Sequence, residues 1–338
     1  MTDVSSTAAA ATTPMRASRA AVPATALWVC VLNPLVIIHL MGGVHNEMLM
    51  VGLMMAGIAL TFEHRPVWGV GLIGVAVAVK ATAGLALPFV VWVWMRQLRD
   101  RHNHPPVRAF ALATAASVMI FAAVFAVMSW LAGVGLGWLS ALAAGNVKII
   151  NWLTVPTAAA NLINAIGGLL FPVNFYAVLD VTRIIGRAII AVSLPVLWGR
   201  CRHTDREALT GIALAMLVVV LFVPAALPWY YTWPLAVAAA LIQTRAGIAA
   251  IAGFSTWIMV MWKPDGAHGM YSWAHVLLTT ACAAVAWYSL YWTRTDDSEA
   301  PPASTPKPGH VARPRGPDAS AGRPRAGHWP AGRSTRPG

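Results

Sequence analysis

Residues 211–223, "GIALAMLVVVLFV", form an apolar run in which polar and apolar positions do not alternate. A strand of a transmembrane barrel alternates in polarity over about ten residues, so this run predicts a helix instead. Similar apolar runs recur along the chain, each near the ~20 residues that a helix needs to cross a bilayer. The sequence therefore predicts an all-α fold, a polytopic transmembrane helical bundle.

The composition agrees with a membrane protein. Of the 338 residues, 58% are hydrophobic and 11% are charged, whereas an average soluble domain carries about 25% charge. The net charge of +12 would suit nucleic acid, but the basic residues cluster in short loops and at the C-terminal end. We interpret them as signals that set membrane orientation, and expect the lipid bilayer, not nucleic acid, as a partner. Cys30, Cys201 and Cys282 lie far apart and are interpreted as packing residues.

Three regions follow one another along the chain. Residues 1–20 are small and polar and lack the charged start and apolar core of a cleavable signal, so we predict a disordered leader. Residues 21–293 form the predicted transmembrane region, with an outer loop at 132–175. Residues 294–338 are rich in Pro, Gly and Arg and cannot bury enough apolar surface to fold, which predicts a disordered basic cytoplasmic tail.

The placement of Lys and Arg predicts the topology, with both termini in the cytoplasm. Residues 67–95 have basic residues at both ends, which favours a hairpin that turns near Lys80 over one long kinked helix. Each arm would have about 13–15 residues, or roughly 20–22 Å, which is less than the ~30 Å hydrocarbon core. With this hairpin the chain has about ten membrane segments: 22–40, 48–63, two in 67–95, 109–131, 176–199, 208–227, 230–243, 246–262 and 273–292.

Polar and charged residues at membrane depth are costly, so they are functional candidates. The predicted topology brings several of them to the outer face, at the start of the second span, at the hairpin turn and in the span at 176–199. In that span, spacings of three and four residues place the charged side chains on one helix face. The candidates are His45, Asn46, Glu47, Lys80, Asp180, Arg183 and Arg187.

Each candidate also has a purely structural interpretation. His45 and Asn46 are suited to capping the helix that follows them. The Lys80 side chain is long enough to snorkel to the outer interface. Asp180 and Arg183 are spaced to neutralise each other. These alternatives stay open on the sequence alone.

Three stretches together resemble a known family. "LNPLVIIHLMGGVHNEMLMVGLMMAGIAL" (32–60), "VAVKATAGLALPFVVWVW" (77–94) and "LPWYYTWP" (227–234) resemble the actinobacterial polyprenyl-phosphate-mannose-dependent α-(1→6)-mannopyranosyltransferases of the GT-C class. The resemblance covers roughly residues 25–292. The aromatic turn at 227–234 is less specific, because it is common among GT-C enzymes, and its aromatic residues would also suit an interfacial belt.

The resemblance implies a GT-C-like helical fold, a multi-pass place in the plasma membrane and an extracytoplasmic active site. It implies polyprenyl phosphomannose as the donor and a growing α-(1→6)-mannan of lipomannan and lipoarabinomannan as the acceptor. Family members carry further spans before the "NPLV" block and an essential acid in their first outer loop, so this chain is expected to lack that N-terminal part. Its predicted outer acids are Glu47, Asp180 and Asp265.

The hypothesis for the reaction gives each candidate a role. A carboxylate acts as the base for the acceptor hydroxyl and comes from Glu47, Asp180 or Asp265. Glu47 and His45 are the predicted catalytic residues, and together with Asn46 they orient the sugar hydroxyls. Cationic groups offset the charge on the departing phosphate. The predicted phosphate ligands are Lys80 and Arg187, and the predicted sugar- or lipid-contacting aromatics are Trp229 and Tyr230.

We expect no cofactor and no metal, because the sequence shows neither a nucleotide-sugar loop nor a set of metal ligands. A transporter or flippase for a lipid-linked solute is the alternative from another class, and it would use the same charges as a pathway. Transporters often show repeated halves, and the sequence shows no such repeat. An inactive, truncated remnant of the transferase is the third possibility.

Overall fold

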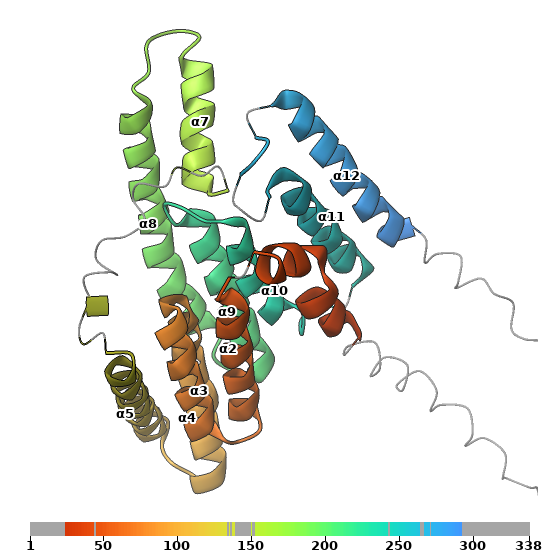
Figure 1. Cartoon of the computed structure of the whole chain (residues 1–338). Helices are drawn as coiled ribbons and strands as arrows, with labels where there is room; N and C mark the ends of the chain where they lie inside the picture. The colour runs from red at the N-terminus through yellow and green to blue at the C-terminus, as the bar shows by residue number, and fades with distance from the viewer. Residues whose placement is uncertain are drawn as a thin grey trace, which may run out of the picture. The chain divides into compact units, whose positions relative to one another are not determined.

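The computed structural model describes residues 24–292, except 44, 134, 136, 139–149, 151–152, 243, 264–266 and 271. The predicted leader, the predicted tail, Asp265 and the middle of the predicted outer loop lie outside these residues. Within the described ranges every regular element is a helix (Figure 1), and the only bridge between extended residues is an isolated pair, Trp262 and His268. The predicted all-α class is confirmed.

The helices follow each other with short connections. They are η1 (Trp28–Leu32), η2 (Val36–Met41), α2 (Glu47–Phe62), α3 (Pro66–Val79), η3 (Ala81–Ala86), α4 (Leu87–His102), α5 (Pro106–Leu131), α7 (Val155–Gly167), α8 (Phe175–Arg200), α9 (Asp205–Phe222), η4 (Pro228–Tyr231), α10 (Thr232–Ala238), α11 (Arg245–Met261) and α12 (Trp273–Trp292).

Among the residues that the structure describes, four helical segments are long and apolar enough to cross a membrane, which supports a membrane protein. They are Ala24–Met41, Ala81–His102, Pro106–Leu131 and Trp273–Trp292. The predicted span at 230–243 is wrong, because α10 has only 7 residues, or about 10 Å. Pro234 has no backbone N–H and fits only the first turn of a helix, so α10 cannot extend back through η4.

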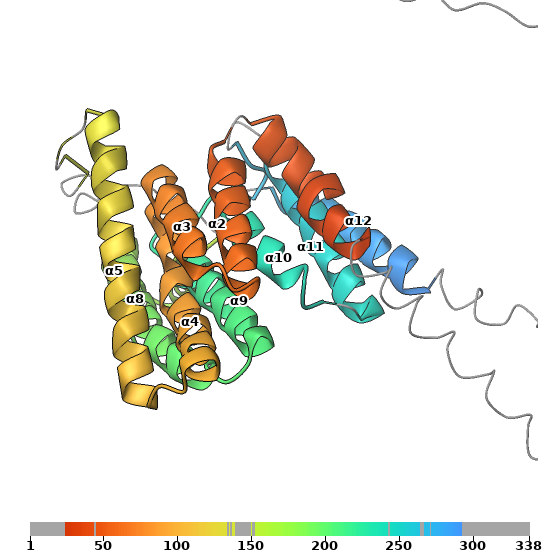
Figure 2. The ribbon, with the colours of Figure 1, turned by 90° about the horizontal axis from the view of Figure 1, so that it is seen from below.

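The chain reverses direction at Lys80, as the basic flanks predicted. Lys80 is extended, with φ −156° and ψ 124°, and it ends α3. Gln97, 17 residues later, donates from Nε2 to the carbonyl of Thr61 at 2.6 Å, and Thr61 lies 19 residues before Lys80. Because α4 returns to the level at which α3 begins, the hairpin is confirmed and one long kinked helix is excluded. Figures 1 and 2 show α2, α3 and α4 side by side.

Small residues let α2 and α3 approach closely. A Cβ added at Gly57 would lie 2.7 Å from the Gly69 carbonyl oxygen, and one added at Gly69 would lie 2.5 Å from the Gly57 carbonyl oxygen. Both neighbours are backbone atoms, which cannot turn aside as a side chain can. The core beside this contact is formed by fully buried apolar side chains such as Met54, Ile58 and Ile73.

We therefore expect Gly57→Ala to destabilise the protein. The added methyl group would push the two helices apart, and overpacking of this kind costs about 1–3 kcal/mol of unfolding free energy. The matched control is Gly52→Ala in the same helix, where an added Cβ meets no atom within 4 Å. Thermal unfolding in one detergent decides the comparison, and equal midpoints for the two variants would contradict close α2–α3 packing.

The remaining helices extend this group on both sides. α5 packs on α3 and α4, α9 packs on α8 and α10, and α11 pairs with α12. The same neighbours are seen in Figure 2, where α3, α4, α5, α8 and α9 lie together and α10 leads to α11 and α12. α7 pairs with α8. η3, which directly follows Lys80, contacts α2 and α9 as well as α3 and α4, so the hairpin turn packs against elements from distant parts of the sequence.

The membrane orientation predicted from the Lys and Arg residues can be tested with reporter fusions. Reporters fused after residues 100, 203, 265 and 310 should report cytoplasm, cytoplasm, outside and cytoplasm, because Lys and Arg concentrate at the first, second and fourth sites. Paired phosphatase and fluorescent-protein fusions measure this. Outside signals at both 100 and 203 would reverse the predicted sides of the hairpin.

Candidate functional site

Glu47 is a buried carboxylate at the start of α2. Its residue is 2% exposed, and its Oε1 accepts a hydrogen bond from Lys80 Nζ. Its Oε2 is buried and has no hydrogen-bond partner in the described part of the chain. A buried carboxylate without a partner for one oxygen is costly to maintain, which is typical of an oxygen that receives a ligand.

Lys80 joins the Glu47 carboxylate to the aromatic turn. Its Nζ lies 4.0 Å from the centroid of the Tyr230 ring and 4.8 Å from that of Trp233. Tyr230 and Trp233 stack on each other with centroids 4.5 Å apart. These cation–π contacts hold the ammonium inward, so the snorkelling interpretation of Lys80 is wrong.

Two histidines, His39 and His45, lie near the ring of Trp229, the residue that precedes Tyr230. The His45 ring stacks on Trp229 with centroids 3.6 Å apart, and the His39 ring lies 6.4 Å from it. Both ring nitrogens of His39 and Nε2 of His45 are buried and lack a hydrogen-bond partner among the described residues. Sequence reasoning missed His39 and left Trp233 out of the site, although a histidine inside an apolar run is itself a signal.

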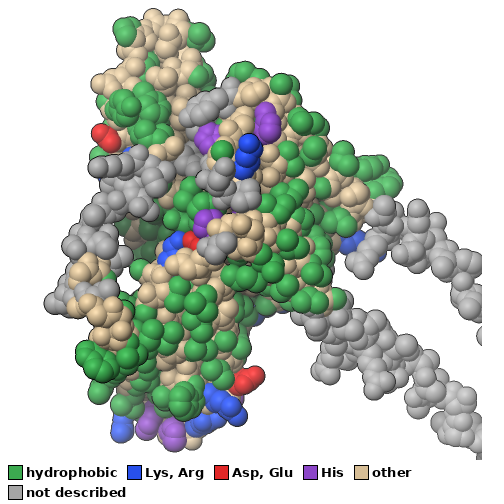
Figure 3. All heavy atoms as spheres, in the orientation of Figure 1, with side chains coloured by type: hydrophobic (Ala, Val, Ile, Leu, Met, Phe, Trp, Pro, Cys, Tyr) green, Lys and Arg blue, Asp and Glu red, His purple; other side chains and the backbone are tan. Residues whose placement is uncertain are grey.

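The structure thus brings together residues from three separate stretches, which we call the Glu47–Lys80 cluster: His39, His45, Glu47, Lys80, Trp229, Tyr230 and Trp233. Figure 3 shows basic, acidic and histidine side chains meeting near the middle of one face. Hydrophobic side chains lie on several sides of this group in the same view.

Two purely structural interpretations of this region are wrong: that the Asn46 side chain caps α2, and that the aromatic turn is an interfacial belt. Asn46 is exposed and stands at the N-cap position of α2, but its side chain makes no capping hydrogen bond. The aromatic turn is not a lipid-facing belt, because Trp229, Tyr231 and Trp233 are all buried. The Tyr231 hydroxyl donates to the carbonyl of Leu153, which anchors the turn to the segment before α7.

Asp180, Arg183 and Arg187 form a second group on α8. Arg183 is buried and donates from Nη2 to the carbonyl of Pro224 at 3.2 Å. Asp180 and Arg187 are exposed on the same helix, and both act electrostatically on Arg183, the first by attraction and the second by repulsion. Pro224 lies four residues before Pro228, so this group contacts the chain segment that leads into the aromatic turn.

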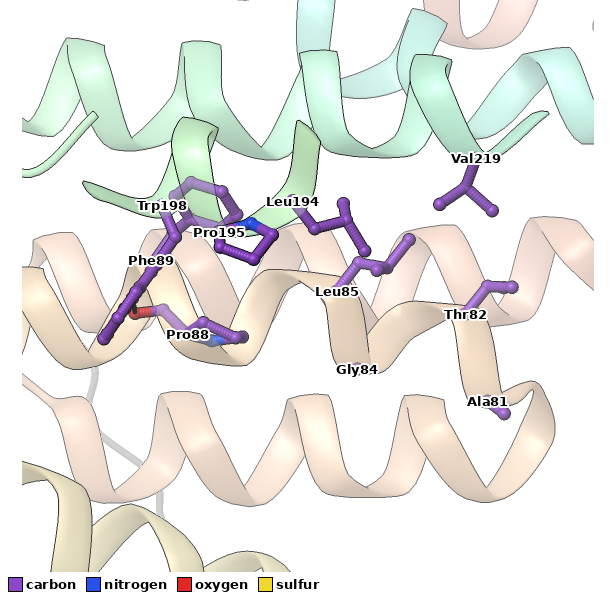
Figure 4. A pocket seen from close by; sticks show the side chains of 10 residues that line it. All are labelled: Ala81, Thr82, Gly84, Leu85, Pro88, Phe89, Leu194, Pro195, Trp198 and Val219. Carbon is purple, nitrogen blue, oxygen red and sulfur yellow. Dashed lines mark hydrogen bonds between the residues drawn. The ribbon is translucent and has the colours of Figure 1, made fainter. Parts of the chain in front are cut away.

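An apolar groove of about 730 Å³ begins next to Lys80. Ala81 and Thr82 line one end, and Figure 4 shows side chains of α8 and Val219 of α9 pointing toward the η3–α4 segment. Most of the lining atoms are carbon. A groove of this kind suits an apolar ligand. The full lining is Ala81, Thr82, Gly84, Leu85, Pro88, Phe89, Leu194, Pro195, Trp198 and Val219.

Two family models match the chain. The model described as "Alpha-(1->6)-mannopyranosyltransferase, N-terminal domain" matches residues 4–96, and the model described as "MptB C-terminal domain" matches residues 156–292. Together they cover more than half of the chain. They include His45, Glu47 and Lys80 in the first match, and the α8 group and the aromatic turn in the second.

Curated relatives carry related names. Alpha-(1->6)-mannopyranosyltransferase A of Mycobacterium tuberculosis is 68% identical over 282 residues, which are 83% of this chain and 54% of the relative. The protein of the same name from Corynebacterium glutamicum is 36% identical over 297 residues, 85% of this chain and 60% of the relative. Alpha-(1->6)-mannopyranosyltransferase B of Corynebacterium glutamicum is 30% identical over 218 residues, 60% of this chain and 36% of the relative.

The chain therefore spans about half the length of the curated relatives that it matches. No solved structure matches it. The resemblance that the three sequence stretches suggested is confirmed by both family models and by these relatives. The chain belongs to the actinobacterial α-(1→6)-mannopyranosyltransferase family.

Proposed function

We propose that the protein acts in the transfer of mannose from polyprenyl phosphomannose to a growing α-(1→6)-mannan, at the extracytoplasmic face of the plasma membrane. The Glu47–Lys80 cluster is the proposed reaction site. One observation carries the proposal: Glu47 is buried, is bound through one oxygen to Lys80, and has its other oxygen without a partner among the described residues.

The unpartnered Oε2 of Glu47 gives the carboxylate a place for the acceptor hydroxyl. In the proposed step the 6-hydroxyl of the acceptor gives its proton to Oε2 while its oxygen bonds to C1 of mannose. The bond from C1 to the phosphate oxygen breaks, and the polyprenyl phosphate leaves with the electron pair. Lys80, which is bound to the other carboxylate oxygen, holds Glu47 in place and supplies positive charge near the leaving group.

The α8 group and His45 complete the proposed site. Arg187 is exposed and is proposed to share the donor phosphate with Lys80, because a guanidinium can bind two phosphate oxygens at once. Asp180 and Arg183 hold that helix face in place. Asn46 and His45 are proposed to contact sugar hydroxyls at the start of α2.

The apolar groove beside Lys80 suits the lipid part of the donor. Its end at Ala81 and Thr82 directly follows Lys80, so a phosphate at the Lys80 ammonium would place the first isoprene units at this end. The hydrocarbon tail would then lie between η3–α4, α8 and α9, where apolar contact replaces contact with water.

Reconstitution tests the proposal directly. The full chain is placed in vesicles with polyprenyl phosphomannose, labelled in the mannose, and a short α-(1→6)-mannoside acceptor. We expect a longer labelled product that α-mannosidase degrades, and no product when a nucleotide-linked mannose replaces the lipid-linked donor. The absence of product from the lipid-linked donor, or an equal yield from the nucleotide-linked one, would refute the proposal.

A further inference from the structure

A second cavity lies at the other end of α4, away from the Glu47–Lys80 cluster. This pocket has a volume of about 450 Å³ and is lined by Arg96, Arg99, Arg202 and His203 together with apolar side chains. Arg96 follows Lys80 by 16 residues, or about 24 Å of helix, and the segment between them is one of the candidate membrane spans. The basic pocket and the proposed reaction site therefore belong to opposite ends of one span.

The charges of the pocket favour an anion. Arg96 pairs with Asp205 and also donates to the Arg202 carbonyl at 2.6 Å, so its charge is already balanced. Arg99 and Arg202 are exposed and form no ion pair in the part of the chain that the structure describes. The Arg202 guanidinium lies over Trp92, 6.0 Å from the ring centroid.

The acidic side chains near the pocket form no ion pair with Arg99 or Arg202 among the described residues, so the pocket keeps an excess of positive charge. Glu207 accepts a hydrogen bond from the backbone N–H of His203 at 2.9 Å, and Asp100 is exposed. Figure 3 shows basic and histidine side chains gathered at the lower end of the face that it draws. The pocket thus presents two guanidinium groups that can both donate hydrogen bonds to one phosphodiester.

An apolar groove of about 430 Å³ meets the basic pocket at Phe110, which lines both. The groove runs between α4, α5 and α8 and includes Val91, Val118 and Trp198 in its lining. Figure 2 shows these three helices next to one another. Aromatic contacts hold the side of the groove that faces the basic pocket. The Trp92 ring packs on Phe110 and on Trp198, with ring centroids 4.8 Å and 5.0 Å apart.

Two hydroxyl groups lie in the apolar groove just beyond Phe110. Thr114 and Ser117 both line it, and their side-chain oxygens are buried without a hydrogen-bond partner among the described residues. Thr114 is one helical turn, about 6 Å, from Phe110. Donors at this depth, between a cationic pocket and a hydrocarbon-lined groove, match the ester carbonyls of a glycerolipid, which lie between its phosphate and its acyl chains.

We infer that the basic pocket and the 430 Å³ groove together bind one anionic phospholipid. The phosphodiester lies between Arg99 and Arg202, the ester carbonyls accept hydrogen bonds from Thr114 and Ser117, and an acyl chain follows α4 past Trp198. Basic pockets between membrane helices are typical sites for anionic lipid head groups. The basic pocket shares no lining residue with the groove proposed for the donor lipid, whereas the 430 Å³ groove adjoins that groove at Gly84, Pro88 and Trp198.

Native mass spectrometry of the full chain tests the inference, with phosphatidylglycerol and phosphatidylcholine of identical acyl chains as probes. Both lipids carry the phosphodiester, but the choline cation of phosphatidylcholine is repelled by the two guanidinium groups. We therefore expect phosphatidylglycerol to be retained at least about tenfold more strongly, since a charge-assisted contact is worth about one order of magnitude in affinity. The Arg99→Gln/Arg202→Gln variant should lose this preference. The matched control, Arg101→Gln/Arg206→Gln, removes the same charge from exposed residues outside the pocket and should keep it.

Two further measurements separate the lipid from a simple anion. Thr114→Phe fills the 430 Å³ groove beside the basic pocket. It should weaken phosphatidylglycerol binding although every arginine remains. Glycerol 3-phosphate, which has the charge without the chains, should not displace the bound lipid from the wild-type protein. Equal retention of both lipids, an unchanged Arg99→Gln/Arg202→Gln variant, or displacement by glycerol 3-phosphate at the potency of the lipid would each overturn the inference. Thermal unfolding of each variant without added lipid verifies that it is folded.

Discussion

Glu47→Gln should reduce mannose transfer by about a hundredfold or more, which is the usual effect of removing a general base. Glutamine keeps the shape of the side chain but cannot take the acceptor proton. It also removes the negative charge that holds Lys80. The measurement is transfer from polyprenyl phosphomannose per molecule of inserted protein, so that a loss of protein is not counted as a loss of activity.

Two comparisons make the result for Glu47 specific. Glu63→Gln removes an exposed acid next to the other end of α2 and should leave transfer unchanged. Glu47→Asp keeps the carboxylate about one methylene short and should keep part of the activity. If Glu47→Gln transfers mannose as fast as the wild type, the pair with Lys80 is only a structural contact and the proposed base is wrong.

Lys80→Met should destabilise the protein as well as inactivate it. The substitution leaves the Glu47 carboxylate buried without its cation, and removing one partner of a buried pair costs about 3–5 kcal/mol. The Lys80 side chain is 23% exposed, so we expect the lower end of that range. Transfer should fall at least about tenfold through loss of the charge-assisted contact. Lys263→Met, at an exposed lysine, is the control.

A double variant separates the two effects of Lys80. Glu47→Gln/Lys80→Met removes both charges, so it should regain most of the unfolding free energy lost in Lys80→Met while remaining inactive. Unfolding in detergent measures the first quantity and labelled transfer the second. A double variant as unstable as Lys80→Met would show that the lysine stabilises through its stem and its aromatic contacts, not through Glu47.

Local sequence signals were sufficient for the helices that have clear ends. The span predicted at 48–63 corresponds to α2 at Glu47–Phe62, and the span predicted at 273–292 coincides with α12. Pro66 and the basic residues before it mark the start of α3, since proline fits the first turn of a helix. The hairpin at Lys80 was predictable because charge sets the side of the membrane on which each segment ends.

The parts that escaped prediction depend on contacts between distant residues. Nothing in local spacing shows that His45 stacks on Trp229, since 184 positions separate them. The break in the first span also has a distant partner: Asn33, before Pro34, donates to Ser255 Oγ at 2.9 Å. The single span predicted at 22–40 therefore contains a break at Asn33, which Pro34 favours locally and whose hydrogen-bond partner only the fold supplies. The lengths of η4 and α10 were missed because their apolar composition does not distinguish a span from a buried turn.

If Trp229 contacts the sugar as the sequence predicts, the stack of His45 on Trp229 makes sugar binding a competition between two rings. One face of the indole is already covered, with 3.6 Å between centroids, and Trp229 is only 8% exposed. A mannose ring can occupy that face only after the imidazole swings away, so the energy of stacking the sugar on the indole is largely offset by the energy of unstacking the histidine. Recognition of the sugar at this position would then be weak in affinity but sensitive to shape, and the substrate's hydrocarbon tail would supply most of the residence time.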